Sequence, residues 1–598
     1  MFYHDLKLNI QDLIRQAVKK EIGIDLDKIR LDLPPSPDLG DLSFSCFEVA
    51  GRVKQSPAEI ASSVASAFAT SFARGYGRSK KASADKSLVP RNDTVKAQAV
   101  GPYVNFFIKD DVLFSAIISA IIEQADNVGD SQLGQDQEVV LEYSSPNTNK
   151  PLHIGHLRNN SLGDSLARIL KSQGYKVHKV GVINDRGAHI CKSMLMYQKY
   201  GQDQLPADRK PDHFVGHFYQ MFEQKMVEDS TLADQAKEML IKWEDGDPEV
   251  RALWKKMNDW IYAGWKVTYD RLGNTFEKLY YESDIYQKGK EVVAQGLTDG
   301  VFYKLADGAV EINLESENLD KKILMRSNGT SVYITQDLYL AELRGQEFPE
   351  AHKFIYVVGM DQEYHFKVLF SILKKLGLEQ NFYHLSYGIV RLPSGKMSSR
   401  AGTVVNADDL IDEVVGLAMS EIKKRTDEVN SDLAESIGLA ALKYYLLHVA
   451  PRKDITFDAE RAVSFEGETG PYIQYTYARM QSIKIKNEKL KIKNSQPKAG
   501  PPRAEKLKVI LNSDEREIIN KLGQFPEVLE RSAENYDPSL MAHYLFELAA
   551  IINSFYHEHQ VLKAAEDERE QRLMMLEAVS IVIKKGLNLL GIDAVERM

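Results

Sequence analysis

The sequence has little of what marks a membrane protein or a disulfide-bonded secreted protein. Its 598 residues include only two cysteines, Cys46 and Cys191, far apart in the chain. That count excludes a disulfide framework and a cysteine-rich structural zinc site, and it favours a reducing compartment. No run approaches the roughly 18 apolar residues that a membrane helix needs, and segment 1–23 lacks the apolar stretch of a signal peptide. We therefore expect a cytoplasmic protein without membrane association.

The sequence also has no excess of positive charge. Its formal net charge is -9 at pH 7 and its pI is near 5.9, which excludes a protein coated in basic residues. A local basic face for nucleic acid remains possible, because phosphate binding depends on the local field. With 43% hydrophobic and 27% charged residues, the composition is that of a globular protein, and the length indicates several domains.

Three regions follow one another along the chain. Residues 1–125 predict a small α/β domain, which contains a polar loop near 78–100. Residues 126–415 predict an α/β domain with a Rossmann-like parallel sheet, interrupted by a charged helical insertion at about 190–330. Residues 416–598 predict an all-α helical bundle, interrupted by a basic linker at 484–508 that we expect to be a solvated loop.

The pattern of the middle region carries the sheet prediction. "QEVVLEYSS" reads as a strand, "GHLRNNSLGDSLARILKSQG" as a helix ending at Gly174, and "KVHKVGVIND" as the next strand. This β-α-β unit implies parallel pairing. Further strand patterns occur in "SVYITQDLYL" (331–340), "KFIYVVGMDQEYHF" (353–366) and "YHLSYGIVRLPSGKMSSRAG" (383–402).

The segment "PLHIGH" places two histidines at the predicted start of that helix. Asn149 is expected to cap the helix, with Pro151 in its first turn. His153 and His156, three residues apart, are expected to share one face where free N–H groups favour anions, and Gly155 allows close approach. The segment suits a nucleoside triphosphate. The alternatives are a structural role for the two histidines and a metal site, and no nearby third ligand supports the latter.

A second motif, "LPSGKMSSRAG" (392–402), places Lys396 among small residues. A lysine in such a loop offers a movable charge for phosphate, although an ordinary surface loop is the alternative. Neither GxxxxGK[ST] nor a GxGxxG after a strand is present, so a P-loop and a dinucleotide site have no support.

Taken together and in this order, "HIGH" and "KMSS" resemble the signature pair of class I aminoacyl-tRNA synthetases. The surrounding residues resemble the bacterial arginyl-tRNA synthetases over nearly the whole chain. The matching segments are "SSPNTNKPLHIGHLRN", "INDRG", "GTSVYITQDL", "GETGPYIQYTYARM" and the C-terminal "LLGIDAVERM".

The resemblance implies a ligase that joins L-arginine to tRNA(Arg) in two steps, with ATP and Mg²⁺ and no structural zinc. His153 and His156 would stabilise the α-phosphate during adenylate formation, and Lys396 would hold the pyrophosphate. The usual motif ends in a second lysine, whereas this chain has Ser399, and Lys150 matches the position thought to compensate. The family also implies that activation waits for tRNA, and we expect a monomer.

Further contacts are carried over from the family by position. On the nucleotide side they are Gly155, Gly359, Asp361, His365, Met397 and Ser398. Around arginine they are Asn147, Glu282, Tyr333, Asp337 and Gln362, where two carboxylates suit a guanidinium. Toward tRNA they are Tyr103, Asn105, Tyr472, Gln474, Tyr475, Arg479 and Met598, although tyrosines at helical spacing are also common in cores.

Three other functions were weighed. A different class I synthetase is disfavoured by the lack of a cysteine-rich zinc site and of room for a large editing domain. A small-molecule nucleotidyltransferase would be shorter and would lack the helical tail. A non-catalytic RNA-binding paralogue would be expected to lose the histidines or the lysine loop, and both are present.

Overall fold

The structure is a computed structural model that describes most of the chain. The description leaves out residues 1, 74–93, 331, 394–404, 425–429 and 494–507. Lys396, Met397, Ser398 and Ser399 therefore lie outside the described residues, as does much of the segments 78–100 and 484–508. Among the helices that are described, none is long and apolar enough to cross a membrane.

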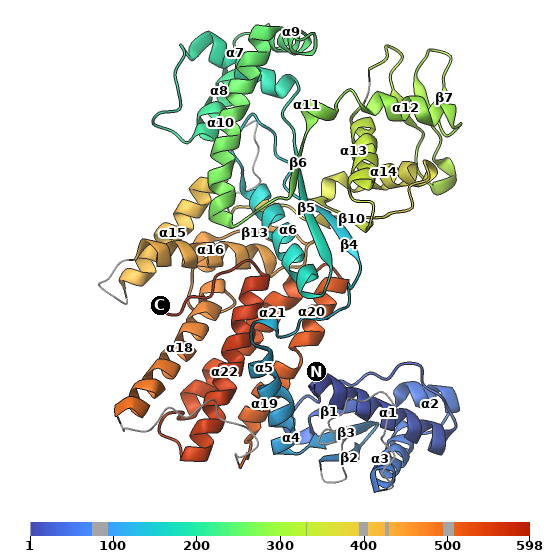
Figure 1. Ribbon diagram of the computed structural model, residues 1–598, viewed down its shortest axis with the longest axis vertical. Coiled ribbons are helices and arrows are strands. Elements are labelled where there is room, and N and C mark those ends of the chain that lie inside the picture. The colour runs from blue at the N-terminus through green and yellow to red at the C-terminus, as the bar shows by residue number, and fades with distance from the viewer. Residues whose placement is uncertain (1, 74–93, 331, 394–404, 425–429, 494–507) are drawn as a thin grey trace.

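A five-stranded parallel sheet lies at the centre of the upper half of the molecule (Figure 1). Its strand order is β11-β10-β4-β5-β6, and all four neighbouring pairs are parallel. The strands are β4 (Glu138–Glu142), β5 (Lys176–Ile183), β6 (Lys278–Tyr281), β10 (Ala351–Gly359) and β11 (Asn381–Tyr387). The winding direction reverses between β4 and β10. In open parallel sheets, ligands bind at the carboxyl ends of the strands at such a point.

Helix α6 (Ile154–Ser172) joins β4 to β5 and is buried on nearly every side. It packs between the sheet and helices of the C-terminal region. A Cβ at Gly163 would lie 2.2 Å from the Tyr143 ring, so glycine allows the close approach of helix and sheet. The predicted β-α-β unit is confirmed, and Gly174, at φ +86°, follows the helix end as expected.

The predicted insertion at about 190–330 consists of two insertions separated by strand β6. The first is helical and holds α7 (Ala188–Tyr200), α8 (Pro211–Lys225), α9 (Leu232–Glu244) and α10 (Pro248–Leu272). The second holds α11 (Glu282–Ile285), α12 (Gly289–Thr298) and an antiparallel sheet of β7 (Tyr303–Lys304), β8 (Val310–Ile312) and β9 (Lys322–Met325). In Figure 1 they lie on opposite sides of the sheet's upper end. Strand β6 was missed because its four residues lie within a charged, helix-like sequence.

One predicted strand is wrong. "SVYITQDLYL" was assigned to a strand because of its aromatic and β-branched residues, but most of it forms helix α13 (Tyr333–Glu347). Ile334, Leu338 and Ala341 are buried against the sheet side of this helix, so its helical periodicity prevails over local propensity. Helix α14 (Glu363–Lys375) follows β10 after one short turn.

The N-terminal region is a small α/β unit, as predicted. Strands β1 (Leu42–Ser45), β2 (Val95–Val100) and β3 (Tyr103–Ile108) form an antiparallel sheet in the order β1-β3-β2. Beside it lie α1 (Phe2–Ile22), α2 (Phe47–Val53) and α3 (Pro57–Ala73). The fully buried Asp41 accepts hydrogen bonds from Arg516 and Asn520, which fastens this unit to the C-terminal region.

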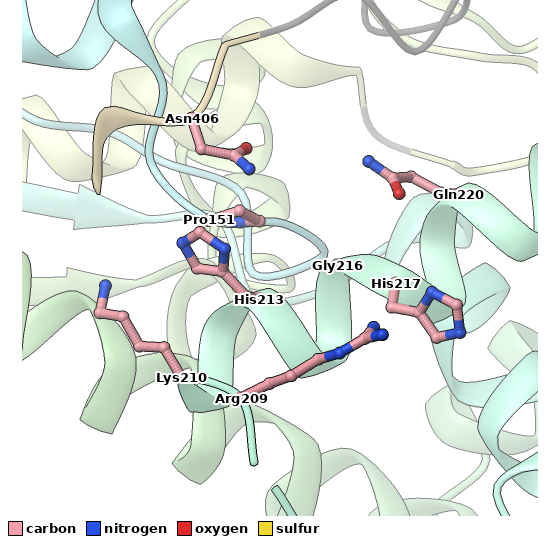
Figure 2. A pocket seen from close by; sticks show the side chains of 8 residues that line it. All are labelled: Pro151, Arg209, Lys210, His213, Gly216, His217, Gln220 and Asn406. Atoms are coloured by element: carbon pink, nitrogen blue, oxygen red, sulfur yellow. The ribbon is translucent and has the colours of Figure 1, made fainter. Parts of the chain in front are cut away.

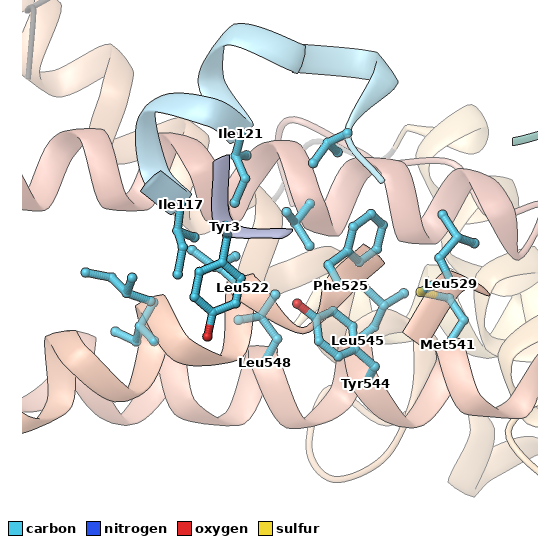
Figure 3. Packing of buried hydrophobic residues seen from close by; sticks show 14 of the residues in the cluster. Tyr3, Ile117, Ile121, Leu522, Phe525, Leu529, Met541, Tyr544, Leu545 and Leu548 are labelled. Atoms are coloured by element: carbon cyan, nitrogen blue, oxygen red, sulfur yellow. The ribbon is translucent and has the colours of Figure 1, made fainter. Parts of the chain in front are cut away.

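The C-terminal region is the predicted helical bundle, and it begins before residue 416. Its helices are α15 (Ala407–Lys423), α16 (Ser431–Leu447), α17 (Ala459–Ala462), α18 (Gly470–Lys493), α19 (Ser513–Gly523), α20 (Phe525–Glu534), α21 (Ser539–Glu558) and α22 (Glu566–Leu589). Short strands β12 (Val390–Arg391) and β13 (Ile455–Thr456) pair beneath it. Helices α4 (Asp110–Phe114) and α5 (Ala120–Gln124) join its core, where Ile117 and Ile121 pack near Tyr3, Leu522 and Leu548 (Figure 3).

Candidate active site

The predicted ATP and arginine residues that the structure describes converge because most of them follow the carboxyl ends of parallel strands. The histidine segment follows β4, Gly359 ends β10, and Glu282 begins α11 directly after β6. The parallel pairing continues past β4 and β5, since Asn147 bridges Asn184. The described loops therefore meet at one edge of the sheet, around the switch point between β4 and β10.

The two histidines cap the helix themselves. Helix α6 begins at Ile154 with His153 as its N-cap, so the predicted cap at Asn149 is wrong. The backbone N–H of Gly155 donates to Nδ1 of His153 over 3.2 Å, and the N–H of His153 donates to Nδ1 of His156 over 3.1 Å. The imidazole centroids are 3.9 Å apart. The rings therefore lie together, although His153 precedes the helix rather than sharing one of its faces.

These hydrogen bonds fix where each imidazole carries its proton. A ring nitrogen that accepts a backbone N–H is unprotonated, so the neutral ring carries its hydrogen on Nε2. Burial, helped by the charge of Lys150, lowers the pKa of His153 to about 3, and burial with His153 and Lys150 lowers that of His156 well below its usual value. At neutral pH the pair thus presents two Nε2–H donors without charge. Two such donors at a helix N-terminus suit phosphate oxygens.

Lys150 lies close to this pair. It is partly buried, and burial lowers the pKa of its ammonium. Its positive charge lowers the pKa values of His153, His156 and His189, so the ammonium lies near all three imidazoles. Within the described residues its ammonium donates no hydrogen bond, so the group is available to an anionic ligand.

The residues on both sides of the segment 394–404 are anchored to the histidine helix. On one side, Arg158 is fully buried and donates to the carbonyl oxygens of Gly388 and Pro451. On the other, the N–H of Ala407 donates to Leu152, and Asn406 bridges His153. The described residues on either side of this segment therefore contact the helix that the two histidines begin.

Residues at the end of β10 form the other wall of the switch point. A Cβ at Gly359 would lie 2.6 Å from Oδ1 of Asp361, so glycine permits this tight turn. Asp361 and Gln362 are exposed and hydrogen-bonded to each other over 2.9 Å. His365 pairs through Nε2 with Asp337 at 2.8 Å. Asn159 of α6 donates to the carbonyl of Val357, which ties β10 to the histidine helix.

Two carboxylates face one another between α11 and α13. Glu282 is buried, and its pKa is raised to about 7, mainly by burial; Arg186 opposes the rise, and Asp185 and Asp337 add to it. Gln336 hydrogen-bonds the same carboxyl. Tyr333, the first residue of α13, is 81% exposed, so its ring is open to solvent one turn before Asp337. A buried carboxyl beside a second one is suited to a cationic group.

A cavity of about 340 Å³ lies beside the histidine segment (Figure 2). Pro151, Asn406 and residues at the start of α8 line it, among them Arg209, Lys210, His213 and His217. Lys210 and His213 are already paired with Asp408. Arg209 is exposed and has no ion pair within the described residues, so it is the lining cation open to an anion.

Two groups of the described residues have the composition of a metal site. Asp212, His213 and Asp408 form one, but the ammonium of Lys210 already contacts both carboxylates. Asp514, Glu558 and His559 form the other, on the helical bundle. The donors at the sheet edge are imidazole, ammonium and backbone N–H groups, which fit a phosphate rather than a resident metal.

The residues predicted to contact RNA differ in accessibility. Tyr103 is 42% exposed, with its ring 6.0 Å from that of Phe47. Asn105 is buried and accepts a hydrogen bond from Ser43, and Gln474 is buried and donates to the carbonyl of Asp593. Both side chains are engaged inside the protein, which argues against direct contact with RNA and in favour of structural roles.

The remaining predicted residues gather at one face of the helical bundle. The guanidinium of Arg479 lies over Tyr475 and over Tyr556, at 4.7 and 5.1 Å from the ring centroids. Tyr472 packs against Phe546. Met598 is partly buried in a cluster that includes Tyr475.

Several residues of the site were not singled out from the sequence. Asp185 and Arg186 lie in "INDRG", which was noted as a motif without roles, and Gln336 adjoins Asp337. Tyr556 is 76 or more residues from the motif that it joins on the surface, so no local pattern marks it. His189 is the third histidine near Lys150, and burial lowers its pKa to about 4.

Comparison with known proteins gives matches along the whole chain. Residues 117–459 match the family described as tRNA synthetases class I (R), catalytic domain. Residues 473–598 match the DALR anticodon binding domain, and residues 8–79 match the arginyl tRNA synthetase N terminal domain.

Individual relatives extend over nearly the full length. The arginine–tRNA ligase of Treponema denticola is 43% identical over 96% of this chain and 95% of its own, and that of Treponema pallidum is 41% identical over 100% and 99%. The solved structure of the Thermus thermophilus arginyl-tRNA synthetase superimposes with a TM-score of 0.77, at 26% identity, over 98% of this chain and 99% of that one.

Proposed function

The chain belongs to the arginyl-tRNA synthetase family of class I, and from this premise we propose which of its residues perform the reaction. The protein ligates arginine to tRNA(Arg) for protein synthesis and uses ATP. This membership removes the other class I synthetases and the small-molecule nucleotidyltransferases from consideration. The two Nε2–H donors at the start of α6 are the observation that carries the proposed active site.

In the first step, the carboxylate of arginine attacks the α-phosphate of ATP and pyrophosphate leaves. His153 and His156 donate from Nε2 to the phosphate oxygens on which charge accumulates. Because the backbone already fixes both rings, they need no reorganisation as the charge develops. Lys150 supplies the positive charge that Ser399 does not provide, and Lys396 holds the leaving pyrophosphate. Mg²⁺ arrives with the triphosphate and shares its charge.

Gly155 and Gly359 allow the nucleotide to approach the backbone on either side of the switch point. Asp361 and His365 would contact the ribose or the phosphates, and Met397 and Ser398 would contribute to ATP binding. Asn147 holds the α-groups of arginine. Glu282 and Asp337 bind its guanidinium, and Tyr333 and Gln362 complete that pocket.

The raised pKa of Glu282 predicts that arginine binds more tightly as the pH rises through 7. Below that pH the carboxyl takes up a proton and loses the charge that pairs with the guanidinium. With a pKa of about 7, we expect the KM for arginine to fall about tenfold between pH 6 and pH 8. Aminoacylation at saturating ATP and tRNA measures this. A Glu282→Gln variant should lose the dependence, and an unchanged profile in that variant would place the titration elsewhere.

The second step requires the tRNA to reach from the helical bundle to the sheet edge. We propose that Tyr475, Arg479 and Tyr556 form a stacking surface for unpaired bases of the anticodon loop, with Tyr472 and Met598 beside it. Tyr103, with Phe47, would contact the tRNA from the N-terminal unit. The cavity lined by Arg209 would receive a phosphate of the 3′ end.

A substitution in the stacking surface should weaken tRNA binding alone. Stacking on an aromatic side chain contributes about 1–3 kcal/mol per base, so Tyr556→Ala should raise the KM for tRNA about tenfold. The KM values for arginine and ATP should not change. Tyr303→Ala, an equally exposed tyrosine of the second insertion, serves as the matched control. Equal effects of the two substitutions would refute the assignment.

We also propose three working units, with the predicted boundary at 415/416 moved to the start of α15: residues 1–125 for tRNA contact, about 126–406 for catalysis, and 407–598 for anticodon binding. The enzyme is proposed to act as a monomer in the cytoplasm, where tRNA charging occurs. Analytical ultracentrifugation with and without tRNA would test whether the enzyme is a monomer.

ATP–pyrophosphate exchange tests the proposed activity as a whole. We expect exchange with arginine among the twenty amino acids, and only when tRNA is present. Exchange at full rate without tRNA would refute the dependence on tRNA. Folded protein that shows no exchange under any condition would instead favour the non-catalytic paralogue.

A further inference from the structure

The side chain of Arg186 lies between two carboxylates that belong to different insertions. Its guanidinium is ion-paired with Glu244 at the end of α9, and its Nη1 lies 3.7 Å from Oε1 of Glu282. The guanidinium stacks on Tyr286, 4.1 Å from the ring centroid. Only 12% of the side chain is exposed. The group is therefore held from three sides, next to the carboxylate proposed to bind the substrate.

Asp185, the residue before Arg186, fixes the position of the loop that carries Arg186. The carboxylate of Asp185 accepts hydrogen bonds from the N–H and the hydroxyl of Ser283, at 2.8 and 2.7 Å. Its carbonyl accepts from the indole of Trp254 over 2.6 Å. The loop after β5 is thus bound both to α10 and to the residue that follows Glu282. Asp185 thus fixes the backbone at Ser283, next to Glu282, and Arg186 contacts the Glu282 side chain.

We propose that Arg186 is a positioning residue for arginine recognition, which orients Glu282 and favours its charged form so that its free oxygen pairs with the substrate guanidinium. The proposal rests on the assignment of Glu282 to arginine. The groups that face Glu282 are Arg186 and Asp185 from the loop after β5, and Gln336 and Asp337 from α13. Beyond them, Glu244 faces Arg186 and His365 faces Asp337. Among these described neighbours Arg186 is the cation, so its removal leaves the carboxyl with the negative Asp185 and Asp337 and the neutral Gln336.

The role differs from that of a built-in competitor. A guanidinium that occupied the substrate's place would have to leave before arginine could bind, and its loss would tighten binding. Arg186 is instead ion-paired with Glu244 on the far side and stacked on Tyr286. Substrate can therefore reach Glu282 from the α13 side, where Asp337 and Tyr333 lie, while Arg186 stays in place.

The test compares Arg186→Met with Arg251→Met in the full-length enzyme with tRNA. Arg251 is the matched control because it stacks on Trp243, 3.6 Å from the ring centroid, and bonds to its carbonyl. Arg186 lies over the same tryptophan at 5.7 Å, but only Arg186 contacts Glu282. The KM for arginine and kcat are measured from pH 6 to pH 9, and thermal unfolding reports on folding.

Arg186→Met should raise the KM for arginine at least tenfold at pH 7 and move the midpoint of its pH profile upward, with kcat at saturating arginine changed less than about threefold. Arg186→Lys should shift the midpoint less, because it keeps the charge. Arg251→Met should leave the midpoint in place. A lower KM or an unmoved midpoint in Arg186→Met would overturn the proposal. Glu282→Gln tests the role of Glu282 separately from that of Arg186. If this variant leaves the KM for arginine unchanged, Glu282 does not bind arginine, whatever the result for Arg186.

Discussion

Replacing His153 with alanine should lower kcat for adenylate formation by about 10²- to 10³-fold, the loss found when one preorganised donor to a developing oxyanion is removed. The reason lies in the hydrogen bonds that His153 makes. Its Nδ1 accepts the N–H of Gly155, so Nε2 carries the hydrogen and is fixed in direction. The same substitution also removes the cap of α6, which should cost about 0.5–2 kcal/mol of stability. Single-turnover ATP consumption and chemical unfolding measure the two effects separately.

Asparagine at position 153 separates capping from chemistry. Its Oδ1 can accept the N–H of Gly155 in place of Nδ1, and asparagine is among the best N-cap residues. It has no donor at the position of Nε2. We expect His153→Asn to be about as stable as the parent and about as inactive as His153→Ala. Activity near the parent level in His153→Asn would mean that the imidazole serves only as a cap, and the proposed donor role would be wrong.

The position of this cap could not be predicted from residue types. Asn149 is the better cap by preference, and Pro151 is a good first-turn residue. The helix begins four residues later because the backbone of Leu152 and His153 pairs with Asn406 and Ala407. An extended segment that pairs with another chain segment cannot also be helical. That partner lies about 250 residues away in the sequence, so no local pattern contains it.

The parallel sheet could be predicted because its signals lie close together in the sequence. The apolar runs of β4 and β5 flank one helix within about 50 residues, and a short crossover leaves little choice of arrangement. Strand β6 carries no such signal, since only Tyr280 of its four residues is buried. The order of the two signature motifs led to the correct family, whereas the position of each site residue depended on which loops meet at the carboxyl edge.

In the arginine pocket, too, the surroundings of single residues depend on long-range contacts that the local sequence does not reveal. Glu282 and Asp337 were assigned by position in short motifs, and both lie at the sheet edge. Their surroundings, however, depend on contacts between the two insertions. Arg186 is held beside Glu282 by Glu244 of α9 and by Tyr286, which follows α11. No spacing rule links these residues, so the charge state of Glu282 became apparent only in the structure.

Replacing Arg344 with methionine should destabilise the protein by about 3–5 kcal/mol, the cost of leaving one partner of a buried ion pair alone. Arg344 lies in α13 with 1% of its side chain exposed, and Glu142 at the end of β4 is its ion-pair partner. Its guanidinium also faces the rings of Tyr280 and Tyr356, at 4.9 and 5.7 Å. The substitution would leave a carboxylate buried beside apolar groups. Urea unfolding at pH 7 measures the loss, and Arg30→Met, which breaks an exposed pair with Asp32, should leave the midpoint unchanged.

A double substitution, Glu142→Gln with Arg344→Met, distinguishes the cost of an unpaired charge from the value of the pair. Because buried pairs gain little net free energy over neutral replacements, the double variant should recover most of the stability that Arg344→Met loses. Arg344→Met should also raise the KM for arginine, because the pair sets the position of α13, which carries Tyr333 and Asp337 at its other end. The double variant should keep this raised KM. Recovery of both quantities would mean that packing alone places α13. Recovery of stability without recovery of arginine binding would assign the buried pair to the alignment of the substrate pocket.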